Sequence, residues 1–345
     1  MTRGEGEDAL KGSTWSLTSE NACTYLVARG RIAAGQACEA RTLGGGVSND
    51  VVLVEGGGRR WVLKQALPRL RVAAQWLADT GRCEVEARCL ELLQGLLPAG
   101  TVPELVFVDS ATHILAMTAL PPEASNLKET LLRGEVSAEL VRQAGALLGT
   151  LQAETRGRGD VREDFADLEP FRQLRLDPYY AEVARRHPRL APAVRAQVGG
   201  LTTRRQCLVH GDYSPKNMLV HAGHLVLLDF EVAHWGCRAF DPAFFLNHLA
   251  LKALHLPEHA QRFLAAAGGF WEAYGASARW PDPEALEAEV VQNLGCLLLA
   301  RVDGKSPVEY LRDEATRDVV RHLGAEILEG RRRLVADVLA AAGEA

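Results

Sequence analysis

The sequence predicts an α+β protein in which a small antiparallel β-sheet lobe precedes a larger, mainly helical lobe. Three observations lead to this prediction. Short apolar stretches separated by glycine-rich turns fill the first third of the chain, as expected of antiparallel strands. Two consecutive prolines, Pro121 and Pro122, then mark a change of character. Beyond them, apolar residues mostly recur at helical spacing.

The composition is that of a folded globular protein. The 345 residues are 47% hydrophobic and 24% charged, which excludes wholesale disorder. A chain of this length favours two domains or lobes. We expect a disordered tail at residues 1–12, a first lobe at 13–120 and a second lobe at 121–345. The formal net charge is -5, and because nucleic-acid binders usually carry a basic excess, we expect no nucleic-acid partner.

The first lobe is expected to begin with a helix that Thr18 or Ser19 can cap and Gly30 can end. Strands bounded by glycine follow, and a second helix with apolar residues at helical spacing ends at Pro98 and Gly100. The predicted helices cover residues 18–29 and 83–96, and the predicted strands cover 39–43, 51–55, 60–65, 103–108 and 113–118.

Helical patterns dominate the second lobe. Several begin with a proline in the first turn, where the missing N–H costs nothing, and Asp282 before Pro283 fits a cap followed by such a proline. Short β segments interrupt the helices. The predicted helices cover residues 127–133, 138–154, 170–186, 192–198, 242–255, 257–274, 283–302 and 307–329, and the strands 206–209, 218–220 and 225–229.

The seven cysteines are odd in number, scattered, and without a C-x-x-C pair. We therefore expect reduced thiols in a cytoplasmic protein rather than a disulfide framework or a zinc site. The acidic, glycine-rich first residues predict neither a signal peptide nor a transit peptide. No apolar run approaches the roughly 18 residues that span a bilayer, so no membrane partner is expected. We expect a monomer or a homodimer.

The strongest functional signal lies in residues 208–220, LVHGDYSPKNMLV. Asp212 is followed five residues later by Asn217, and Asp229 ends the next predicted strand. The two short strands would bring these side chains to neighbouring ends of one ribbon. Phosphoryl transfer needs a carboxylate that orients the attacking hydroxyl and accepts its proton. It also needs oxygen ligands that hold Mg²⁺ against the nucleotide phosphates.

Two other interpretations of these residues stay open. Asp and Asn favour turns and caps, so all three side chains could be structural. Alternatively, His210, Asp212 and Asp229 could ligate the metals of a hydrolase, although the other histidine and carboxylate clusters of such sites are missing.

A glycine-rich segment in the first lobe, LGGGVSNDV at residues 43–51, lies between two predicted strands. Its glycines would let backbone amides approach phosphate oxygens, although a plain hairpin turn has the same pattern. Lys64 follows one strand later, in an otherwise apolar strand. A buried ammonium group there needs an anionic partner, either a phosphate or a carboxylate of the helix at 83–96.

These segments resemble the aminoglycoside phosphotransferase and choline kinase superfamily, which has a bilobal protein-kinase-like fold. The form H-G-D-x-x-x-x-N matches at 210–217, D-x-E matches at 229–231, and the L-G-G-G-x-S-N turn matches at 43–49. The resemblance implies an ATP-dependent kinase with a small-molecule hydroxyl acceptor and with ATP and Mg²⁺ as cofactors. A protein kinase is disfavoured because D-F-G and A-P-E are missing.

By this resemblance Asp212 is the catalytic base, Asn217 and Asp229 ligate Mg²⁺, His210 supports the loop, and Asp241 bonds the loop backbone. Lys64 is expected to pair with Glu86, with Glu84 as the fallback, and to contact the nucleotide. The other expected nucleotide contacts are Gly44, Gly45, Gly46, Ser48, Asn49 and the hinge residues Met117 and Ala119.

A narrower resemblance, to methylthioribose kinases, is carried by KQALP at residues 64–68 and the arginine-rich turn after it. Those enzymes depart from the usual H-G-D and D-x-E forms, which this chain keeps. A methylthioribose-kinase-like sugar kinase is therefore an alternative, and a catalytically silent nucleotide-binding protein is another.

The acceptor is expected on the helices of the second lobe. The candidate segment is a polar break between two apolar helices that contains Arg301, Asp303 and Lys305, and Glu231 is a further candidate. A capped helix–helix turn explains the break as well. Residues 256–330 hold 13 acidic and 7 basic side chains. This excess could attract a cationic aminoglycoside or amine, although solvated helix faces explain it equally well. Aminoglycosides, sugars, choline-like amines and amino alcohols all stay open.

Overall fold

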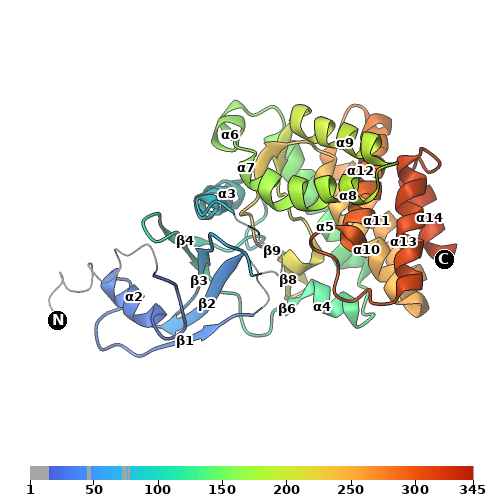
Figure 1. Cartoon of the computed structure of the whole chain (residues 1–345). Helices are drawn as coiled ribbons and strands as arrows, with labels where there is room; N and C mark the ends of the chain where they lie inside the picture. Colours follow the sequence, from blue (N-terminus) through green and yellow to red (C-terminus); the bar gives the residue numbers. More distant parts are fainter. Residues whose placement is uncertain (1–14, 45–47, 72–75, 77, 345) are drawn as a thin grey trace. The chain divides into compact units, whose positions relative to one another are not determined.

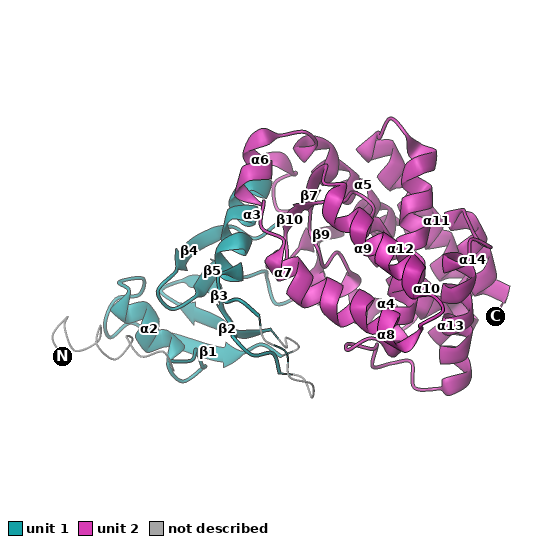
Figure 2. Cartoon of the chain, turned by 45° about the horizontal axis from the view of Figure 1, so that its top comes forward, with its two compact units in different colours: residues 1–94, 102–122 teal, residues 95–101, 123–345 magenta. Residues whose placement is uncertain are grey.

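The computed structural model describes residues 15–44, 48–71, 76 and 78–344. Its chain divides into two compact units (Figures 1 and 2). Unit 1 comprises residues 1–94 and 102–122, and unit 2 comprises residues 95–101 and 123–345. The expected disordered tail at 1–12 lies outside the described residues.

Unit 1 is built on a five-stranded antiparallel sheet with the order β1-β2-β3-β5-β4. Gly57 and Gly58 join β2 to β3 with φ angles of 63° and 72°, which a two-residue hairpin turn requires. The strands are β1 (Cys38–Thr42), β2 (Asn49–Gly56), β3 (Arg59–Ala66), β4 (Leu105–Asp109) and β5 (Ile114–Thr118). The predicted α+β class, with its antiparallel sheet, is confirmed.

The alternation of side chains along β3 gives its two faces different tasks. Trp61 and Leu63 join the apolar cluster that includes Tyr25 and Leu26 of helix α2 (Ala22–Ala28). Because successive side chains in a strand point to opposite faces, Lys64 lies on the other face. Its ammonium group meets a carboxylate of helix α3 (Arg82–Leu96) there.

A disulfide joins Cys23 of α2 to Cys38 of β1, so the prediction of uniformly reduced cysteines is wrong. The number and scatter of cysteines carry no information about which helix packs beside which strand. Because disulfides are rare in a reducing cytoplasm, cysteine usage no longer supports a cytoplasmic location. The other five cysteines are free and buried.

Unit 2 is mainly helical and centres on α10 (Phe240–His255), whose residues are buried from Phe240 to Ala253. Two antiparallel sheets complete it, β6-β8-β9 and β7-β10. The strands are β6 (Ser125–Asn126), β7 (Cys207–Val209), β8 (Met218–His221), β9 (His224–Leu227) and β10 (His234–Gly236). The remaining helices are α4 (Leu127–Leu132), α5 (Ala138–Thr155), α6 (Gly159–Asp164), α7 (Glu169–Phe171), α8 (Glu182–Arg186), α9 (Ala191–Thr203), α11 (Ala260–Ala278), α12 (Pro283–Asp303), α13 (Glu314–Leu328) and α14 (Val335–Glu344).

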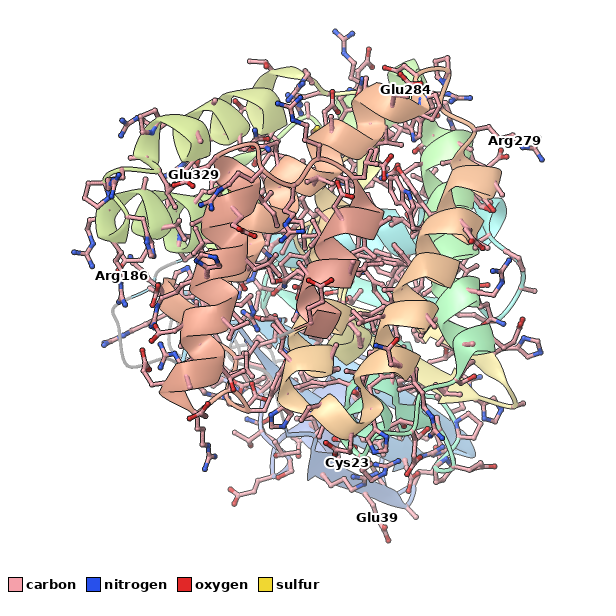
Figure 3. The ribbon with its side chains drawn as sticks, turned by 90° about the vertical axis from the view of Figure 1, so that its right-hand side faces the viewer. Cys23, Glu39, Arg186, Arg279, Glu284 and Glu329 are labelled. Carbon is pink, nitrogen blue, oxygen red and sulfur yellow. A yellow bond between two sulfur atoms is a disulfide. The ribbon has the colours of Figure 1, made fainter. Side chains whose placement is uncertain are left out.

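Close helix packing in unit 2 depends on two glycines of α5. A Cβ atom at Gly145 would lie 2.3 Å from the carbonyl oxygen of Phe270, and one at Gly149 would lie 2.7 Å from that of Tyr274, both in α11. On the surface of unit 2 the helices carry exposed charged side chains, for example Arg186, Glu284 and Glu329 (Figure 3). In the described part of the chain, no helix is long and apolar enough to cross a bilayer.

Two helix predictions differ from the structure for local reasons. The predicted helix at 170–186 contains a π-helical stretch, Arg172–Ala181, with Pro178 inside it. Proline has no N–H to donate, and it disturbs the regular α-helical ladder. The helix predicted from 307 begins only at Glu314, where Asp313 caps it by accepting from the Thr316 N–H at 2.8 Å. Helices α6 and α14 and strands β6 and β10 were not predicted.

Candidate active site

The loop between β7 and β8 carries Asp212, and Gly211 sets its path. Gly211 has a φ of 77°, a left-handed conformation that favours glycine. Its Cα also packs closely, because an added Cβ would lie 2.7 Å from the carbonyl oxygen of Val232. A short 3-10 turn, Pro215–Asn217, then leads into β8. The backbone on both sides of Asp212 is thereby fixed.

His210 is buried and ties this loop to the end of β9. Its Nδ1 accepts from the Asp212 N–H at 3.2 Å, so its Nε2 carries the hydrogen and donates to the Leu228 carbonyl oxygen at 3.1 Å. Burial lowers the pKa of His210, although the Asp212 and Asp229 carboxylates act in the opposite direction. The ring is therefore a neutral strut between the two segments.

Asp241, in the first turn of α10, holds the same loop through its backbone. Its carboxylate accepts from the N–H groups of His210 and Gly211 at 2.7 and 3.0 Å. Burial raises the pKa of Asp241 to about 7, while these two hydrogen bonds favour the charged form. The side chain is fully buried, so it supports the loop from the interior of unit 2.

The carboxylate of Asp212 is fixed at both oxygens. Arg175 Nη2 lies 2.7 Å from Oδ1, and Asn217 Nδ2 donates to Oδ2 at 2.7 Å. Burial alone would raise the pKa of Asp212, but Arg175, followed by Lys216 and the hydrogen bond from Asn217, outweighs it and holds the pKa below its ordinary value. Asp212 is consequently an oriented, ionised carboxylate at neutral pH.

Arg175, from the π-helical stretch, is the residue that sequence reasoning missed. It donates through Nε to the Gly211 carbonyl oxygen at 2.7 Å, and its side chain is 9% exposed. Its only sequence signal is a charge among the buried residues Leu174, Leu176 and Tyr179. That signal does not reveal which loop the charge will meet.

Asp229 and Glu231 follow β9 and complete the acidic side of the site. Asp229 is half-buried and adopts a φ of 69°, which aspartate tolerates better than most residues. Glu231 is buried. Burial alone would lower the pKa of Arg175, but Asp212, Tyr179 and these two carboxylates outweigh it and raise that pKa. Three carboxylates therefore lie within electrostatic range of one guanidinium group.

In unit 1, Lys64 forms a buried ion pair with Glu86 rather than Glu84. Lys64 Nζ lies 2.6 Å from Glu86 Oε2, and the two side chains are 9% and 2% exposed. The periodicity of α3 places Glu86 among its buried residues, whereas Glu84 is only half-buried. Such a pair holds the ammonium group in one place within an apolar lobe.

The other expected nucleotide contacts of unit 1 are only partly visible. Gly44 precedes β2, whereas Gly45 and Gly46 lie outside the described residues. Asn49 is buried at the start of β2 and donates to Ser48 Oγ at 3.0 Å. At the expected hinge, Met117 is a buried residue of β5, and the Ala119 N–H donates to the Arg60 carbonyl oxygen at 3.1 Å. The amide donor of Ala119 is therefore engaged within unit 1.

The predicted acceptor segment is a helix end rather than an open loop. Arg301 and Asp303 form the last turn of α12, and Lys305 is exposed beyond it. Asp303 is buried, and its Oδ2 lies 2.8 Å from His187 Nε2 and 3.0 Å from Arg321 Nε. Its carboxylate is thus occupied within the fold.

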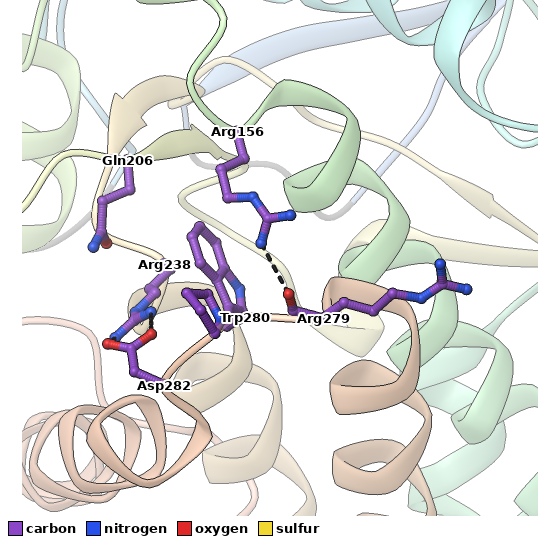
Figure 4. A pocket seen from close by; sticks show the side chains of 7 residues that line it. Arg156, Gln206, Arg238, Arg279, Trp280 and Asp282 are labelled. Carbon is purple, nitrogen blue, oxygen red and sulfur yellow. Dashed lines mark hydrogen bonds and ion pairs between the residues drawn. The ribbon is translucent and has the colours of Figure 1, made fainter.

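Two further features of the described chain stand apart from these residues. In unit 1, Cys83, Glu84 and His113 offer ligand atoms within 4.8 Å of one another, but a thiol suits softer metals than Mg²⁺. In unit 2, a pocket of about 400 Å³ surrounds Trp280, with Arg156 and Arg238 over its ring (Figure 4). None of the sequence-predicted site residues lines this pocket.

Comparison with protein families gives a match over most of the chain. The family described as "Phosphotransferase enzyme family" matches residues 39–288. Methylthioribose kinases of Bacillus cereus (strain AH187) and Bacillus anthracis are each 24% identical to the chain. The first covers 88% of both chains, and the second covers 89% of both.

Solved structures share the fold at low identity. A choline/ethanolamine kinase family protein from Mesorhizobium loti has a TM-score of 0.51 and 16% identity, covering 95% of this chain and 100% of its own. Amicoumacin kinase hAmiN, in complex with AMP-PNP, Ca²⁺ and Ami, has a TM-score of 0.54 and 15% identity over 86% of this chain and 89% of its own. The resemblance inferred from the sequence motifs, and with it the protein-kinase-like fold, is confirmed.

Proposed function

Because the chain belongs to the phosphotransferase enzyme family, we propose that it is an ATP-dependent kinase with Asp212 as its catalytic base. It transfers the γ-phosphate of ATP to a hydroxyl group of a small molecule. The observation that carries this proposal is the double restraint on Asp212, whose two carboxylate oxygens are held by Arg175 and Asn217. A hydroxyl that hydrogen-bonds to this carboxylate is oriented for in-line attack.

The protonation state of Asp212 supports this role. Arg175, Lys216 and the hydrogen bond from Asn217 outweigh the effect of burial on its pKa, so the carboxylate is ionised at neutral pH. A weak base of this kind acts mainly by orienting the hydroxyl, and it accepts the proton as the bond to phosphorus forms. His210 and Asp241 act through the backbone of the loop and touch no reacting atom.

The residues of unit 2 fit a bound Mg²⁺. Mg²⁺ prefers oxygen ligands, and Asp229 supplies a carboxylate. Asn217 uses its amide nitrogen on Asp212, which leaves the amide oxygen as the atom that can ligate a metal. When bound with ATP, Mg²⁺ would neutralise the charge of the phosphates and of the transferred group.

In unit 1, Lys64 is the residue proposed to contact the nucleotide phosphates, with Glu86 holding its ammonium group in place. Ser48, Asn49 and the glycines before them would supply backbone N–H groups and polar side chains. A pre-positioned ammonium group loses little freedom when ATP binds, which is why the carboxylate partner matters.

The curated relatives give a second candidate for the acceptor. They are methylthioribose kinases that match 88% of the chain at 24% identity, so a thio-sugar of that kind belongs in any acceptor screen. The third possibility, a silent nucleotide-binding protein, is disfavoured because Lys64, Asp212, Asn217 and Asp229 are all present.

The Asp212→Asn variant tests the proposal. It keeps the size of the side chain but cannot accept the proton, so we expect Mg²⁺-dependent ADP release to fall by about 10²–10⁴-fold. Binding of a fluorescent ATP analogue should persist. Asp164→Asn, at an exposed position of α6, is the matched control and should keep full turnover. Full turnover by the Asp212 variant would overturn the assignment, and absence of ATP turnover in the native chain would favour the silent binder.

A further inference from the structure

Besides Arg175, three basic side chains of unit 2 lie within electrostatic range of buried His248. They are Lys128 of α4, Lys252 of α10 and Arg301 of α12, which together we call the basic cluster. They come from three helices far apart in the sequence. A gathering of like charges inside a helical unit is unfavourable unless something negative offsets it.

Tyr179 links the basic cluster to Asp212. The guanidinium carbon of Arg175, which pairs with Asp212, lies 5.7 Å from the centre of the Tyr179 ring. That of Arg301 lies 5.6 Å from the same centre, and Arg301 Nη1 donates to the Tyr179 hydroxyl oxygen at 3.0 Å. A single tyrosine therefore separates the proposed catalytic base and its arginine from the cluster.

Lys252 is the most deeply buried member. Its residue is 0% exposed, its ammonium group lies 3.4 Å from the His248 carbonyl oxygen, and it lies 5.3 Å from the centre of the Tyr310 ring. Burial, followed by the charges of Lys128 and Arg301, lowers the pKa of Lys252 to about 7. The fold thus keeps an ammonium group where its charge is poorly compensated.

Within the described residues, the protein itself supplies little negative charge here. Glu309 pairs with Lys128 and also lies within electrostatic range of Lys252 and Arg301. Among the described residues, neither Lys252 nor Arg301 has a carboxylate oxygen within 4.0 Å. In addition, Arg301 Nε and the Tyr310 hydroxyl are buried without a hydrogen-bond partner. Buried donors without partners cost free energy, so these groups are suited to a ligand that accepts hydrogen bonds.

We propose that the basic cluster binds an anionic group of the acceptor, a phosphate or a carboxylate, while a hydroxyl of the same molecule meets Asp212. This inference rests on the proposed kinase function. It also reverses the expectation of a cationic acceptor, which was drawn from the acidic excess of residues 256–330. A net charge counted over a segment does not show which side chains lie close together in the fold. Arg301 and Tyr310 are partly exposed whereas Lys252 is 0% exposed, so an anionic group would approach from the side of Arg301 and Tyr310.

The proposed reaction conserves atoms and charge in the ordinary way of a kinase. The acceptor oxygen forms a bond to the γ-phosphorus of ATP while the bond from that phosphorus to the β–γ bridging oxygen breaks, which releases ADP. The hydroxyl proton passes to Asp212 and then to solvent. The anionic group takes no part in bond making, and its contribution is to position the hydroxyl.

Matched acceptors and two variants test the inference. We would measure ADP release with glucose, glucosamine, gluconate and glucose 6-phosphate, and with ribose, methylthioribose and ribose 5-phosphate. We expect an anionic member to be preferred by at least tenfold in kcat/KM, and the phosphate and carboxylate arms then identify which anion is used. Arg301→Gln and Lys252→Met should each raise the KM of that acceptor by about 10–100-fold and leave the KM of ATP unchanged. Arg262→Gln, at an exposed position of α11, is the control.

The outcomes separate this inference from the function on which it rests. Preference for a neutral or amine acceptor, or an acceptor KM indifferent to both variants, overturns the anion site and leaves the kinase assignment intact. ATP turnover that depends on Asp212 but that no anionic acceptor stimulates also counts against the anion site. If the native chain shows no ATP turnover with any of these acceptors, the kinase function itself is rejected. Thermal unfolding of each variant checks that it is folded.

Discussion

Arg175 holds the main chain and the carboxylate of one loop at the same time. Its Nε donates to the Gly211 carbonyl oxygen at 2.7 Å, and its Nη2 lies 2.7 Å from Asp212 Oδ1. A planar guanidinium group can make both contacts because its donors point in fixed directions. The orientation and the ionisation of Asp212 therefore depend on a residue outside every motif of the sequence.

Replacing Arg175 should impair catalysis more than nucleotide binding. A lysine at this position cannot make both contacts, so we expect Arg175→Lys to lower kcat by about 10–100-fold with little change in the KM of ATP. Because Arg175 lowers the pKa of Asp212, the acid limb of the kcat profile should also move to higher pH. Arg172→Lys, at an exposed position of the same stretch, is the control. An unmoved acid limb would show that Arg175 does not set the ionisation of Asp212.

The buried pair of Lys64 and Glu86 gives a prediction about unit 1. Glu86→Gln leaves a buried ammonium group with a neutral partner, which should cost about 3–5 kcal/mol of unfolding free energy and raise the KM of ATP. The double variant Lys64→Met, Glu86→Gln should recover part of the stability but none of the activity. Urea unfolding and ATP kinetics measure the two effects. Equal stability of the single and double variants would contradict the coupling.

The sequence predicted what depends on local rules. The strands predicted between Asn217 and Asp229 are present as β8 and β9, which pair as a short hairpin. A short hairpin leaves little choice of geometry for the residues at its ends. The family resemblance likewise indicated Glu86, which meets Lys64. Such features are fixed by residues close together in the chain or by the periodicity of one element.

What the sequence did not predict depends on contacts between distant segments. Arg175 reaches Asp212 across 37 positions of chain numbering, and the link from Tyr179 to Arg301 spans more than a hundred. The disulfide between Cys23 and Cys38 requires α2 to lie beside β1. No periodicity reports which side chain of one helix will face a given loop, so these contacts require the tertiary fold.

Gly211 should be intolerant of a side chain for two separable reasons. Gly211 and Gly223 have φ angles of 77° and 78°, so alanine costs each about 1–2 kcal/mol of backbone strain. Only at Gly211 would the new Cβ also meet Val232, at 2.7 Å from its carbonyl oxygen, whereas open space surrounds Gly223. Gly211→Ala should therefore lose more unfolding free energy than Gly223→Ala, and it alone should lose activity. Equal losses in urea unfolding would disprove the steric argument.

The disulfide of unit 1 should stabilise the fold measurably. Cys23 and Cys38 are 15 residues apart, and closing a loop of that length in the unfolded chain is worth about 3 kcal/mol. Dithiothreitol should lower the urea midpoint of the native chain by a corresponding amount. The double variant Cys23→Ser, Cys38→Ser should have the lower urea midpoint from the outset, and dithiothreitol should not change it. A native midpoint that dithiothreitol leaves unchanged would contradict the prediction.

His234 is buried without charge, so its contribution to stability should fall in mild acid. Its ring stacks on Phe171 with centroids 4.1 Å apart, and its Nδ1 lies 2.9 Å from the Val232 carbonyl oxygen. Burial, reinforced by Arg205 and Arg175, lowers the pKa of His234 from 6.5 to about 4. Between these two values the unfolded chain binds a proton that the folded chain does not, so stability is full above pH 6.5 and is lost as the pH falls towards 4.

The loss due to His234 should be on the order of 3 kcal/mol, because each pKa unit corresponds to about 1.4 kcal/mol. His234→Phe keeps the stacked ring and removes the proton site. We therefore expect the variant to lack this loss between pH 6.5 and 4, measured against the native chain by urea unfolding at several pH values. Asp241, whose pKa burial raises to about 7, adds stability as the pH falls, and it does so in both chains. His210 and His248, whose pKa values burial also lowers, should leave part of the slope in place. His224→Gln, at an exposed strand position, is the control. A slope equal to that of the native chain would show that His234 carries its proton in the folded state.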